Sequence, residues 1–379
     1  MRIHSLLDND FYKLTMMQAV YHNFAAVTAE YALVCRSHHH AAELAQIAPA
    51  LKKEITQLSE LTLSAEERDY LSGLNCFSPD FIEYLSAFRF APELVSVSSA
   101  DGQLVLRIQG PWLKTILFEV PLLALINELF YETRFPEIPR TALPPLEELR
   151  AADVRFSDFG TRRRISFEHQ SRVLGAIKDF SGFTGTSNVL FAMRGNVPPI
   201  GTMAHEYLQA GQAIFTPRTG QREMLKLWLR EHGGKFAVAL TDVITTEGFL
   251  ADFDRELTEA YTGLRHDSGD PVEWGRAMLA HYKKLDIDPK TKSLVFSDMI
   301  TPAKAAAISK AFSGQTKVLF GIGSWLDNNI GLPRLNSVIK MVRCNGKPVA
   351  KITNNTEKTT SEDSEYLAAL RSVYGLKTP

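Results

Sequence analysis

The sequence predicts an α/β fold with two parts: an irregular (β/α) barrel, and a second α+β domain built mainly from the N-terminal segment. The chain has 379 residues, which at ~150 residues per domain suggests two or three domains. Up to about residue 144, apolar residues recur mostly at helical spacing. From about residue 151, short apolar runs alternate with helical stretches, which is typical of parallel strands joined by helices.

The N-terminal part reads as helices followed by a hairpin. Residues 41–63 and 65–88 carry apolar side chains at helical spacing. Ser64 followed by Glu67 forms a capping box, which predicts a helix beginning at residue 65. Residues 95–108 contain two alternating runs joined by Asp-Gly, the pattern of a two-residue β-turn.

The most apolar stretch of the chain runs from Trp112 to Phe130. Charged Lys114 and Glu119 interrupt it, so it falls short of the ~20 apolar residues that a membrane span needs. We interpret it as a core element. Four prolines within residues 134–145 then indicate a linker. We therefore predict an N-terminal domain over residues 1–148, a catalytic barrel domain over 149–343, and a C-terminal segment over 344–379 that packs back on the N-terminal domain.

The barrel is predicted from a series of strand-like runs, most of them separated by helical stretches. Seven or eight such units in succession suggest a TIM-like barrel. The runs are residues 154–158, 185–188, 200–205, 236–242, 261–267, 293–298, 318–323 and 337–340, and the helical stretches are 165–180, 206–231, 246–260, 271–285 and 302–312.

Polar residues follow most of these runs. In a barrel the carboxyl ends of the strands converge on one face, where catalysis occurs. Each Asp or Ser alone is equally explained as the cap of the next helix, but capping does not explain the His and Arg residues. The strand-end residues are Asp158, Asn188, His205, Asp242, Asp267, Asp298 and Gly323.

Composition narrows the function. Lys plus Arg number 42 and Asp plus Glu 43, giving a net charge of -1, so nothing draws the whole chain toward nucleic acid or anionic lipid. The three cysteines are far apart, which disfavours a disulfide framework or a zinc ribbon. The N-terminus has no apolar signal-peptide core. We expect a soluble, cytoplasmic protein.

Two of the strand ends are followed by groups that suit phosphates. Three arginines, Arg162 to Arg164, follow the Asp158-Phe-Gly turn, and guanidinium forks match phosphate or carboxylate oxygens. The alternative is a solvated basic helix start, which the helix dipole disfavours. Gly321 and Gly323 flank a second strand end, where glycines allow a backbone to approach an anion closely.

Two other strand ends carry acid–base chemistry. His205 beside Glu206 can act as base, acid or nucleophile, with the glutamate orienting the ring, although a lone buried histidine is usually structural. Arg265 precedes Asp267 and Asp270, whose carboxylates are the hard ligands that Mg²⁺ prefers. Ser297 and Asp298, at the next strand end, suit the hydroxyls of a ribose.

Taken together, the sequence resembles the nicotinate phosphoribosyltransferase family. The matching segments occur in order along nearly the whole chain, which makes the set far more specific than any one motif. They are residues 6–16, 34–36, 158–164, 185–188, 201–206, 264–274, 320–323 and 344–351.

The resemblance implies a type II phosphoribosyltransferase, active as a homodimer with sites at the subunit interface. Its reaction would join nicotinate to 5-phosphoribosyl 1-diphosphate, giving nicotinate mononucleotide and diphosphate, the first step of NAD salvage from nicotinate. Such enzymes couple this transfer to ATP hydrolysis through a phosphohistidine, with Mg²⁺, and are classed as ligases.

The resemblance also assigns residues. His205 stands at the phosphohistidine position, with Glu206, Arg265 and Asp267 in the catalytic group and Mg²⁺ expected at Asp267 and Asp270. Tyr12 and Arg265 would hold the pyridine ring and its carboxylate. The further expected substrate-binding residues are Arg36, Arg162, Arg163, Ser187, Asn188, Thr202, Ser297, Asp298, Gly321, Gly323, Ser324 and Lys340, with a lysine of the pair Lys347 and Lys351 as a looser assignment.

One departure from the family pattern is plain. The family usually has threonine after the second glycine of the GxG motif, where this chain has Ser324 followed by Trp-Leu-Asp-Asn-Asn. Serine keeps the hydroxyl, so the altered loop affects the details of phosphate or diphosphate contact but not the expected reaction.

Three alternatives remain. A nicotinamide- or quinolinate-specific transferase would share the donor site and differ in the acceptor pocket. A metal-dependent barrel hydrolase would use His205, Asp242, Asp267 and Asp298, but zinc and iron sites of that kind want at least two histidines. A non-catalytic paralogue is disfavoured because His205 is present.

Overall fold

The computed structural model describes residues 1–137, 142–353, 359 and 361–376. The chain divides into two compact units that are not continuous in sequence. The first comprises residues 1–151, 156–201 and 322–340, and the second comprises 152–155, 202–321 and 341–379. The domains expected from sequence were consecutive segments. The difference arises because packing depends on which elements meet in space, whereas patterns along the chain show only neighbours in sequence. The expected linker, residues 134–145, lies partly outside the described residues.

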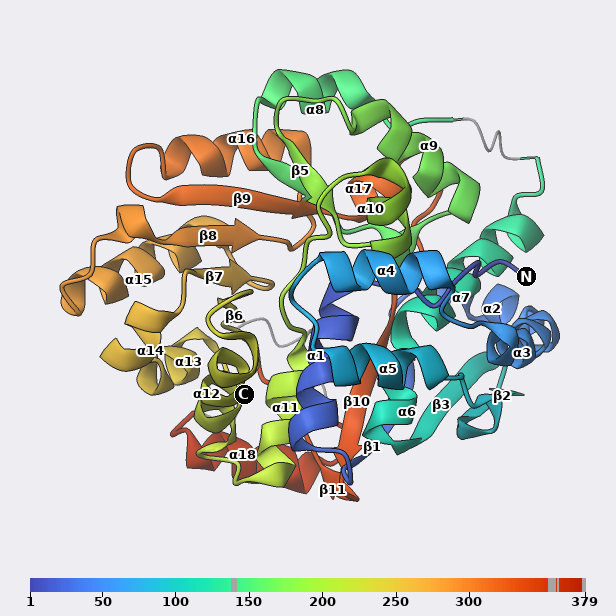
Figure 1. Cartoon of the computed structure of the whole chain (residues 1–379), viewed down its shortest axis with the longest axis horizontal. Helices are drawn as coiled ribbons and strands as arrows, with labels where there is room; N and C mark the ends of the chain where they lie inside the picture. Colours follow the sequence, from blue (N-terminus) through green and yellow to red (C-terminus); the bar gives the residue numbers. More distant parts are fainter. Residues whose placement is uncertain (138–141, 354–358, 360, 377–379) are drawn as a thin grey trace. The chain divides into compact units, whose positions relative to one another are not determined.

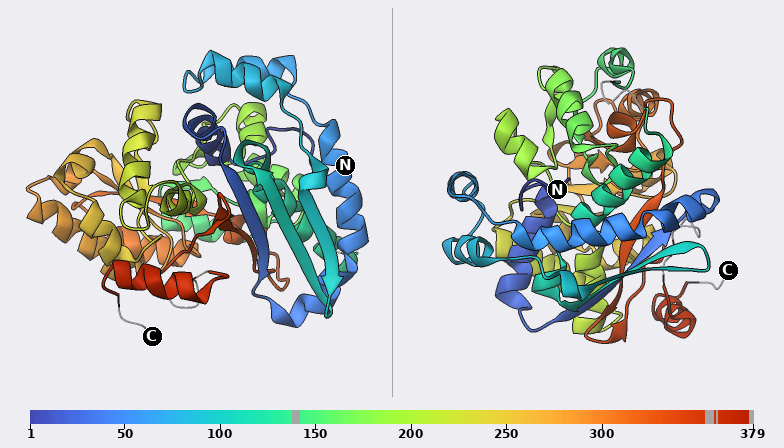
Figure 2. Two further views of the ribbon diagram at one scale, coloured as in Figure 1. Left: turned by 90° about the horizontal axis from the view of Figure 1, so that it is seen from below. Right: turned by 90° about the vertical axis from the view of Figure 1, so that its right-hand side faces the viewer.

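The first unit is α+β. Its strands β1, β2 and β3 form antiparallel pairs and run side by side (Figure 2), with α2 and α3 packed against them. A second pair, β4 and β5, is parallel. Its elements are α1 (Phe11–Asn23), β1 (Thr28–Cys35), α2 (Ala41–Gln46), α3 (Ala48–Gln57), α4 (Ala65–Gly73), α5 (Pro79–Ala87), β2 (Val95–Ala100), β3 (Gln103–Pro111), α6 (Trp112–Thr115), α7 (Glu119–Arg134), α8 (Leu146–Ala152), β4 (Phe156–Asp158), the 3₁₀ turn η4 (Thr161–Arg163), α9 (Phe167–Ile177), β5 (Phe183–Thr186), α10 (Val189–Gly195) and α17 (Ser324–Asp327).

The second unit contains a parallel sheet in the order β9-β8-β7-β6 (Figure 1). Helices α15 and α16 contact one another. Strand β10 begins in the first unit and ends in the second. The elements are α11 (His205–Ile214), α12 (Gly220–His232), β6 (Val238–Leu240), α13 (Thr246–Asp252), α14 (Arg255–Ala260), β7 (Gly263–His266), α15 (Pro271–Lys284), β8 (Ser293–Phe296), α16 (Pro302–Ala311), β9 (Lys317–Ile322), β10 (Ser337–Cys344), β11 (Lys347–Pro348) and α18 (Ser364–Val373).

Several local predictions are confirmed. Ser64 and Glu67 form the capping box of α4, with both reciprocal hydrogen bonds present. Asp101 and Gly102, with φ of 51° and 71°, make the turn between β2 and β3, as the paired positive φ angles of a type I′ turn require. Helices α6 and α7 hold the apolar stretch, and the core of α7 is buried from Glu119 to Tyr131. The three cysteines are free thiols.

Several long helices expected from sequence are divided. Residues 65–88 form α4 and α5, because Ser78 and Pro79 begin a new helix. Residues 206–231 form α11 and α12, separated by a loop that contains Pro217. Pro49 sits in the first turn of α3, which starts after α2 ends, so residues 41–63 also form two helices. Because apolar residues continue at helical spacing across these breaks, the sequence pattern predicted single long helices.

Two expected barrel strands are not barrel strands. Residues 200–205 form a loop that leads into α11, and Pro198 and Pro199 before it lack the N–H that a ladder needs. Strand β10 turns back at Asn345 and Gly346, with φ of 49° and 70°, and pairs antiparallel with β11. Among the described residues of either unit, no closed ring of strands is present. The predicted α/β class is confirmed, as a mixed α/β fold with parallel and antiparallel sheets.

No helix within the described ranges is both long and apolar enough to cross a membrane.

Candidate functional site

The predicted site residues occur in both units. Those in the first unit are Tyr12 on α1, Arg36 after β1, Arg162 and Arg163 in η4, Ser187 and Asn188 after β5, Gly323 and Ser324 at the start of α17, and Lys340 in β10. Those in the second unit are Thr202 before α11, His205 and Glu206 on α11, Arg265 in β7, Asp267 and Asp270 after it, Ser297 and Asp298 after β8, and Gly321 in β9.

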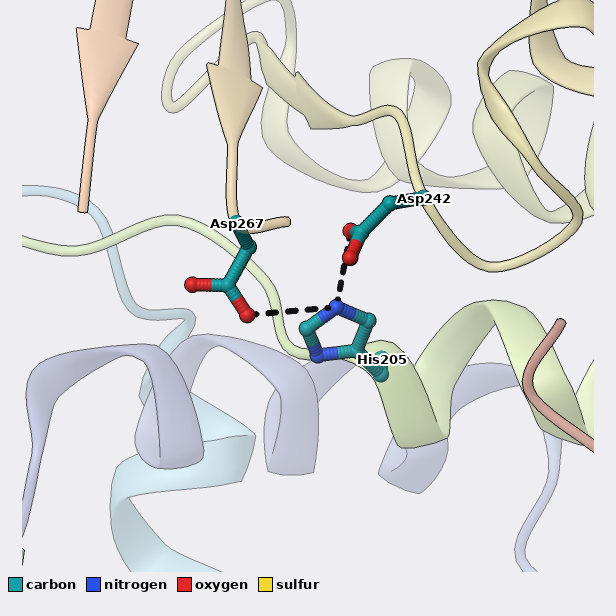
Figure 3. A group of neighbouring side chains, drawn as sticks. All are labelled: His205, Asp242 and Asp267. Carbon is teal, nitrogen blue, oxygen red and sulfur yellow. Dashed lines mark hydrogen bonds and ion pairs between the residues drawn. The ribbon is translucent and has the colours of Figure 1, made fainter. Parts of the chain in front are cut away.

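In the second unit, His205 is the centre of a buried group of charged side chains. Its Nε2 lies 2.9 Å from Asp242 Oδ1 and 3.5 Å from Asp267 Oδ2 (Figure 3). Lys351 Nζ lies 2.8 Å from the same nitrogen and 2.7 Å from Asp242 Oδ2. Ser268 Oγ donates to Asp242 Oδ2 at 2.8 Å. We call His205, Asp242, Asp267, Ser268 and Lys351 the histidine cluster.

The electrostatics of the histidine cluster keep the imidazole neutral. Burial, and then the Lys351 ammonium, lower the pKa of His205 to about 4. Burial alone would raise the pKa of Asp242, but Lys351 and His205 outweigh it and hold that pKa well below its usual range. Burial likewise raises the pKa of Asp267, but the charges of His205 and Arg265 outweigh it and lower that pKa to about 2. At neutral pH the cluster is a neutral imidazole beside two carboxylates and an ammonium.

Only one hydrogen bond can be made at His205 Nε2, because a protonated nitrogen donates to a carboxylate and an unprotonated one accepts from an ammonium. A lone pair on Nε2 would face the Asp242 Oδ1 carboxylate oxygen at 2.9 Å, whereas Lys351 can direct its N–H groups to Asp242 Oδ2. The consistent assignment is Nε2–H donating to Asp242 Oδ1, with the lone pair on Nδ1. In Figure 3, Nδ1 is the ring nitrogen turned away from both carboxylates.

Arg265 presents a guanidinium with spare donor capacity. It donates one long hydrogen bond, 3.4 Å, from Nη1 to the Met203 carbonyl. Its buried Nε has no hydrogen-bond partner in the described part of the chain. Buried donors in native structures are normally satisfied, so this fork is suited to an anionic ligand such as a carboxylate.

In the first unit, five cations gather around two carboxylates. Glu119 lies 2.6 Å from Lys13 and 2.9 Å from Arg162, and these charges outweigh its burial and lower its pKa to about 2. Burial, then Arg162, lowers the pKa of Arg163 to about 10, and Arg36 adds to the shift. Lys340 also acts on Glu119. We call Lys13, Arg36, Arg162, Arg163 and Lys340 the cation cluster.

A second carboxylate, Asp10, also lies beside the cation cluster. Besides Glu119, Arg162 approaches Asp10 at 3.7 Å, and burial raises the pKa of Asp10. Arg163 donates to a neutral group, the Ser337 carbonyl, at 2.6 Å. A buried guanidinium whose pKa is lowered by burial and by neighbouring cations, as that of Arg163 is, is stabilised when an anion binds beside it. The cluster therefore has the chemistry of a phosphate site.

The three consecutive arginines do not share one role. Arg164 is fully buried and makes two hydrogen bonds to Asp8, of 2.7 and 2.9 Å, and one of 2.8 Å to Glu128. Arg162 and Arg163 keep exposure and belong to the cation cluster. Of the three arginines, Arg162 and Arg163 are therefore the ones available to a ligand, as their predicted substrate-binding role requires.

Other predicted residues are used structurally. The Asn188 side chain donates to Asp8 and caps α10 by accepting from Phe191 N, so its polar atoms are engaged. Ser187 donates to Asp10 at 2.7 Å. Asp270 Oδ1 accepts from two backbone N–H groups at the start of α15, both at 2.8 Å, and the residue is exposed. This is the capping alternative that the sequence left open.

Sequence reasoning assigned the orienting role at His205 to Glu206, whereas Asp242 lies at hydrogen-bond distance from the ring. It placed Asp242 at a strand end but left it out of the predicted transferase site. Lys351 was foreseen only loosely, as a diphosphate ligand. It lies 146 residues from His205, and no local pattern could link the two. The strand-end position of Asp242 was the available signal.

Comparisons with known proteins agree on one family. Residues 154–378 match the model of the nicotinate phosphoribosyltransferase family, and residues 7–127 match the model of its N-terminal domain. Nicotinate phosphoribosyltransferase of Ralstonia nicotianae is 41% identical over 391 aligned residues, covering 100% of both chains. The protein of that name from Pectobacterium carotovorum is 44% identical, covering 99% of this chain and 96% of its own.

Solved structures agree as well. The crystal structure of nicotinate phosphoribosyltransferase from Vibrio cholerae has a TM-score of 0.94 and 36% identity, covering 100% of this chain and 95% of its own. That of the Porphyromonas gingivalis protein has a TM-score of 0.91 and 32% identity, covering 99% and 100%. The chain belongs to the nicotinate phosphoribosyltransferase family.

Proposed function

We propose that this chain is an enzyme that transfers the phosphoribosyl group of 5-phosphoribosyl 1-diphosphate to nicotinate, forming nicotinate mononucleotide and diphosphate, coupled to ATP hydrolysis. Family membership supports the transfer reaction. The observation that carries the coupling is the neutral His205 imidazole held by Asp242 and Lys351. We place the enzyme in NAD salvage, in the cytoplasm, as a homodimer.

The transfer itself needs no general base, because the pyridine nitrogen of nicotinate is already a nucleophile. As the bond from C1 to the diphosphate breaks, positive charge develops on the ribose and negative charge on the leaving group. Catalysis then depends on holding the two reactants in line and neutralising the diphosphate. The cation cluster, with Arg162 and Arg163, is suited to phosphate oxygens of the donor.

Arg265 favours nicotinate over nicotinamide as the acceptor. The carboxylate of nicotinate would accept from the guanidinium donors that the protein leaves unused. Nicotinamide offers no negative charge there. We assign Tyr12, which is buried on α1, and Thr202 to the pyridine ring by resemblance, and Ser297, Asp298, Gly321, Gly323 and Ser324 to the donor.

ATP coupling follows from the tautomer of His205. Nδ1 attacks the γ-phosphorus, a P–N bond forms, the bond to the bridging oxygen breaks, and ADP leaves. The proton stays on Nε2, where Asp242 stabilises the positive charge that the ring gains on phosphorylation. The phosphohistidine adds negative charge and acceptor oxygens, which order neighbouring loops and raise affinity for the donor.

Mg²⁺ would neutralise phosphate charge on ATP and the diphosphate. Of the two predicted ligands, Asp267 fits better, since it is a half-buried carboxylate among the catalytic groups. Asp270 serves as a helix cap. His205, Asp242 and Asp267 also have metal-ligand spacing. The Lys351 ammonium, 2.7 Å from Asp242 and 4.0 Å from Asp267, opposes a dication among them and disfavours the hydrolase alternative.

One assay tests the function. The protein is incubated with Mg²⁺, ATP, the donor and nicotinate, nicotinamide or quinolinate in turn, and mononucleotide and ADP are quantified. We expect mononucleotide from nicotinate alone, with ADP formed alongside it. Turnover of nicotinamide at a matching rate would reject the acceptor assignment.

A histidine variant tests the coupling. His205→Asn is expected to abolish phosphoenzyme labelling from [γ-³²P]ATP and the ATP-dependent gain in donor affinity. His39→Asn, at an exposed histidine, is the matched control. Unchanged ATP stimulation in His205→Asn would exclude the phosphohistidine.

Sedimentation velocity of the parent protein tests the proposed homodimer, which should sediment as a species of twice the mass of the chain.

A further inference from the structure

Asp327, the last residue of α17, is a buried carboxyl that the proposed function does not use. Its side chain is completely buried. Neither of its oxygens has a hydrogen-bond donor among the residues that the structure describes. A buried ionised carboxylate without donors is very unfavourable, so this group calls for a specific explanation.

The neighbour that explains it is Asp158, at the end of β4. Asp158 Oδ1 accepts from Gly160 N at 2.8 Å, and Oδ2 accepts from Gln170 Nε2 at 3.0 Å and Thr186 Oγ1 at 2.7 Å. Both oxygens of Asp158 therefore already accept hydrogen bonds from neighbouring groups. Two ionised carboxylates could not bond to each other. The Asp327 side chain is within hydrogen-bonding reach of Asp158, and its Oδ2 lies against Gly160, whose N–H donates to Asp158. If Asp327 carries a proton, it therefore has Asp158 as an acceptor.

The wider charge environment agrees. Burial, and then the negative charge of Asp158, raise the pKa of Asp327 well above its usual range, and Asp10 adds to the shift. Arg164 opposes it, but Arg164 is already paired with Asp8 and Glu128. The proton therefore resides on the carboxyl that has no other hydrogen bonds.

Asp327 also lies where two predicted phosphate-binding segments of the first unit meet, residues 158–163 and 323–327. A Cβ on Gly160 would lie 1.4 Å from Asp327 Oδ2, and one on Gly323 would lie 2.8 Å from Phe159 O. Both glycines are thus required by close approach. Phe159 N donates to Ile322 O at 2.9 Å and Ile165 N donates to Asp327 O at 3.3 Å.

We propose that Asp327 is a positioning residue, held as a protonated carboxylic acid that donates to Asp158 and so fixes the loop of Arg162 and Arg163 against the turn of Gly323 and Ser324. The inference rests on the proposed function, since these are the segments assigned to the donor. Asp327 does not itself contact the donor. It sets the geometry of the groups that do.

Three substitutions separate the role of the donor from the role of the side-chain volume. Asp327→Asn keeps the shape and supplies a permanent N–H donor. Asp327→Leu keeps the volume and removes the donor, and Asp327→Ala removes both. We expect Asp327→Asn to keep the KM for the donor and kcat within about twofold of the parent. We expect Asp327→Leu and Asp327→Ala to raise the donor KM about tenfold or more, with kcat and the KM for nicotinate much less affected.

A spectroscopic measurement tests the proton without activity. Infrared difference spectroscopy at neutral pH, comparing the parent with Asp327→Asn, should show the C=O stretch of a protonated carboxyl in the parent alone. Absence of that band overturns the proposal, as does a donor KM in Asp327→Asn as poor as in Asp327→Leu. If the parent transfers no phosphoribosyl group at all, the proposed function fails while the band still tests the proton.

Discussion

The cation cluster and the histidine cluster are both built from buried or half-buried charges, yet their charges are balanced differently. In the histidine cluster, two carboxylates lie beside one ammonium, with the Arg265 guanidinium acting on Asp267 from outside the cluster, and the imidazole is neutral. In the cation cluster, the charges of Arg162 and Arg36, together with burial, lower the pKa of Arg163, while Glu119 and Asp10 lie beside Arg162. Paired opposite charges hold one side chain in a defined protonation state, whereas neighbouring like charges are stabilised when a ligand of opposite charge binds.

The consecutive arginines Arg162 to Arg164 test this contrast directly. Arg164 is paired with two carboxylates, whereas the charges of Arg162 and Arg36 lower the pKa of Arg163. Arg164→Met leaves Asp8 and Glu128 buried without their partner, and breaking such a pair costs about 3–5 kcal/mol. We expect a loss of that size in the free energy of unfolding, measured by denaturant titration. Arg150→Met, at an exposed pair with Glu147, should cost at most about 1 kcal/mol. Equal losses in the two variants would contradict the structural role of Arg164.

Arg163 should show the opposite behaviour. Arg163→Met relieves repulsion from Arg162 and Arg36, so we expect little loss of stability. It removes a charge-assisted contact to phosphate worth about 1.5–3 kcal/mol, and therefore raises the donor KM about 10–100-fold. Steady-state kinetics at fixed nicotinate measures it, with exposed Arg68→Met as control. A donor KM equal to that of the control would remove Arg163 from the donor site.

The pH dependence of phosphoenzyme formation tests the balance of the histidine cluster. Neutral His205 is the nucleophile, so labelling should fall on the acid side as pH drops through about 4. Lys351 disfavours the imidazolium, and Asp242 and Asp267 favour it. Lys351→Met therefore raises the pKa, and the acid limb moves upward, toward the ordinary histidine value.

The matched control is Lys347→Met, at an exposed lysine of β11. It should leave the acid limb where it is in the parent. The measurement is the initial rate of ³²P incorporation from [γ-³²P]ATP between pH 4 and 8, the range over which an ordinary histidine also titrates. A limb that stays in place in Lys351→Met, or moves downward, would show that the ammonium does not control the imidazole.

Several site residues and turns could be predicted from local sequence, but the long-range charge pairs that define the two clusters could not. The pattern of a parallel strand followed by a helix was the signal for Arg265 and Asp267, in and just after β7, whereas His205 was singled out at the end of a predicted strand that is a loop leading into α11. Turn chemistry gave the hairpin at Asp101 and Gly102 for the same reason. In each case the physical cause lies within a few residues of its signal.

The unpredicted features depend on distant pairs. Lys351 reaches His205 across 146 residues, and Arg164 reaches Asp8 across 156. Three identical side chains in succession look alike in sequence, and only the η4 turn separates the buried Arg164 from Arg162 and Arg163. The barrel expectation has the same weakness. The parallel strands in both units support it, but strand count along the chain does not determine whether a sheet closes.

The smallest effect is expected at Ser324, where the chain departs from the family pattern. Ser324 is the half-buried first residue of α17, and threonine there would keep the hydroxyl and add one methyl group. Because positive charge in the cation cluster, rather than one hydroxyl, dominates phosphate binding in our proposal, Ser324→Thr should change the donor KM by no more than about threefold, under 1 kcal/mol. Ser324→Ala, which removes the hydroxyl, is the companion variant. A tenfold gain in donor affinity in Ser324→Thr would mean that the turn after Gly323, not the arginines, limits donor binding in this chain.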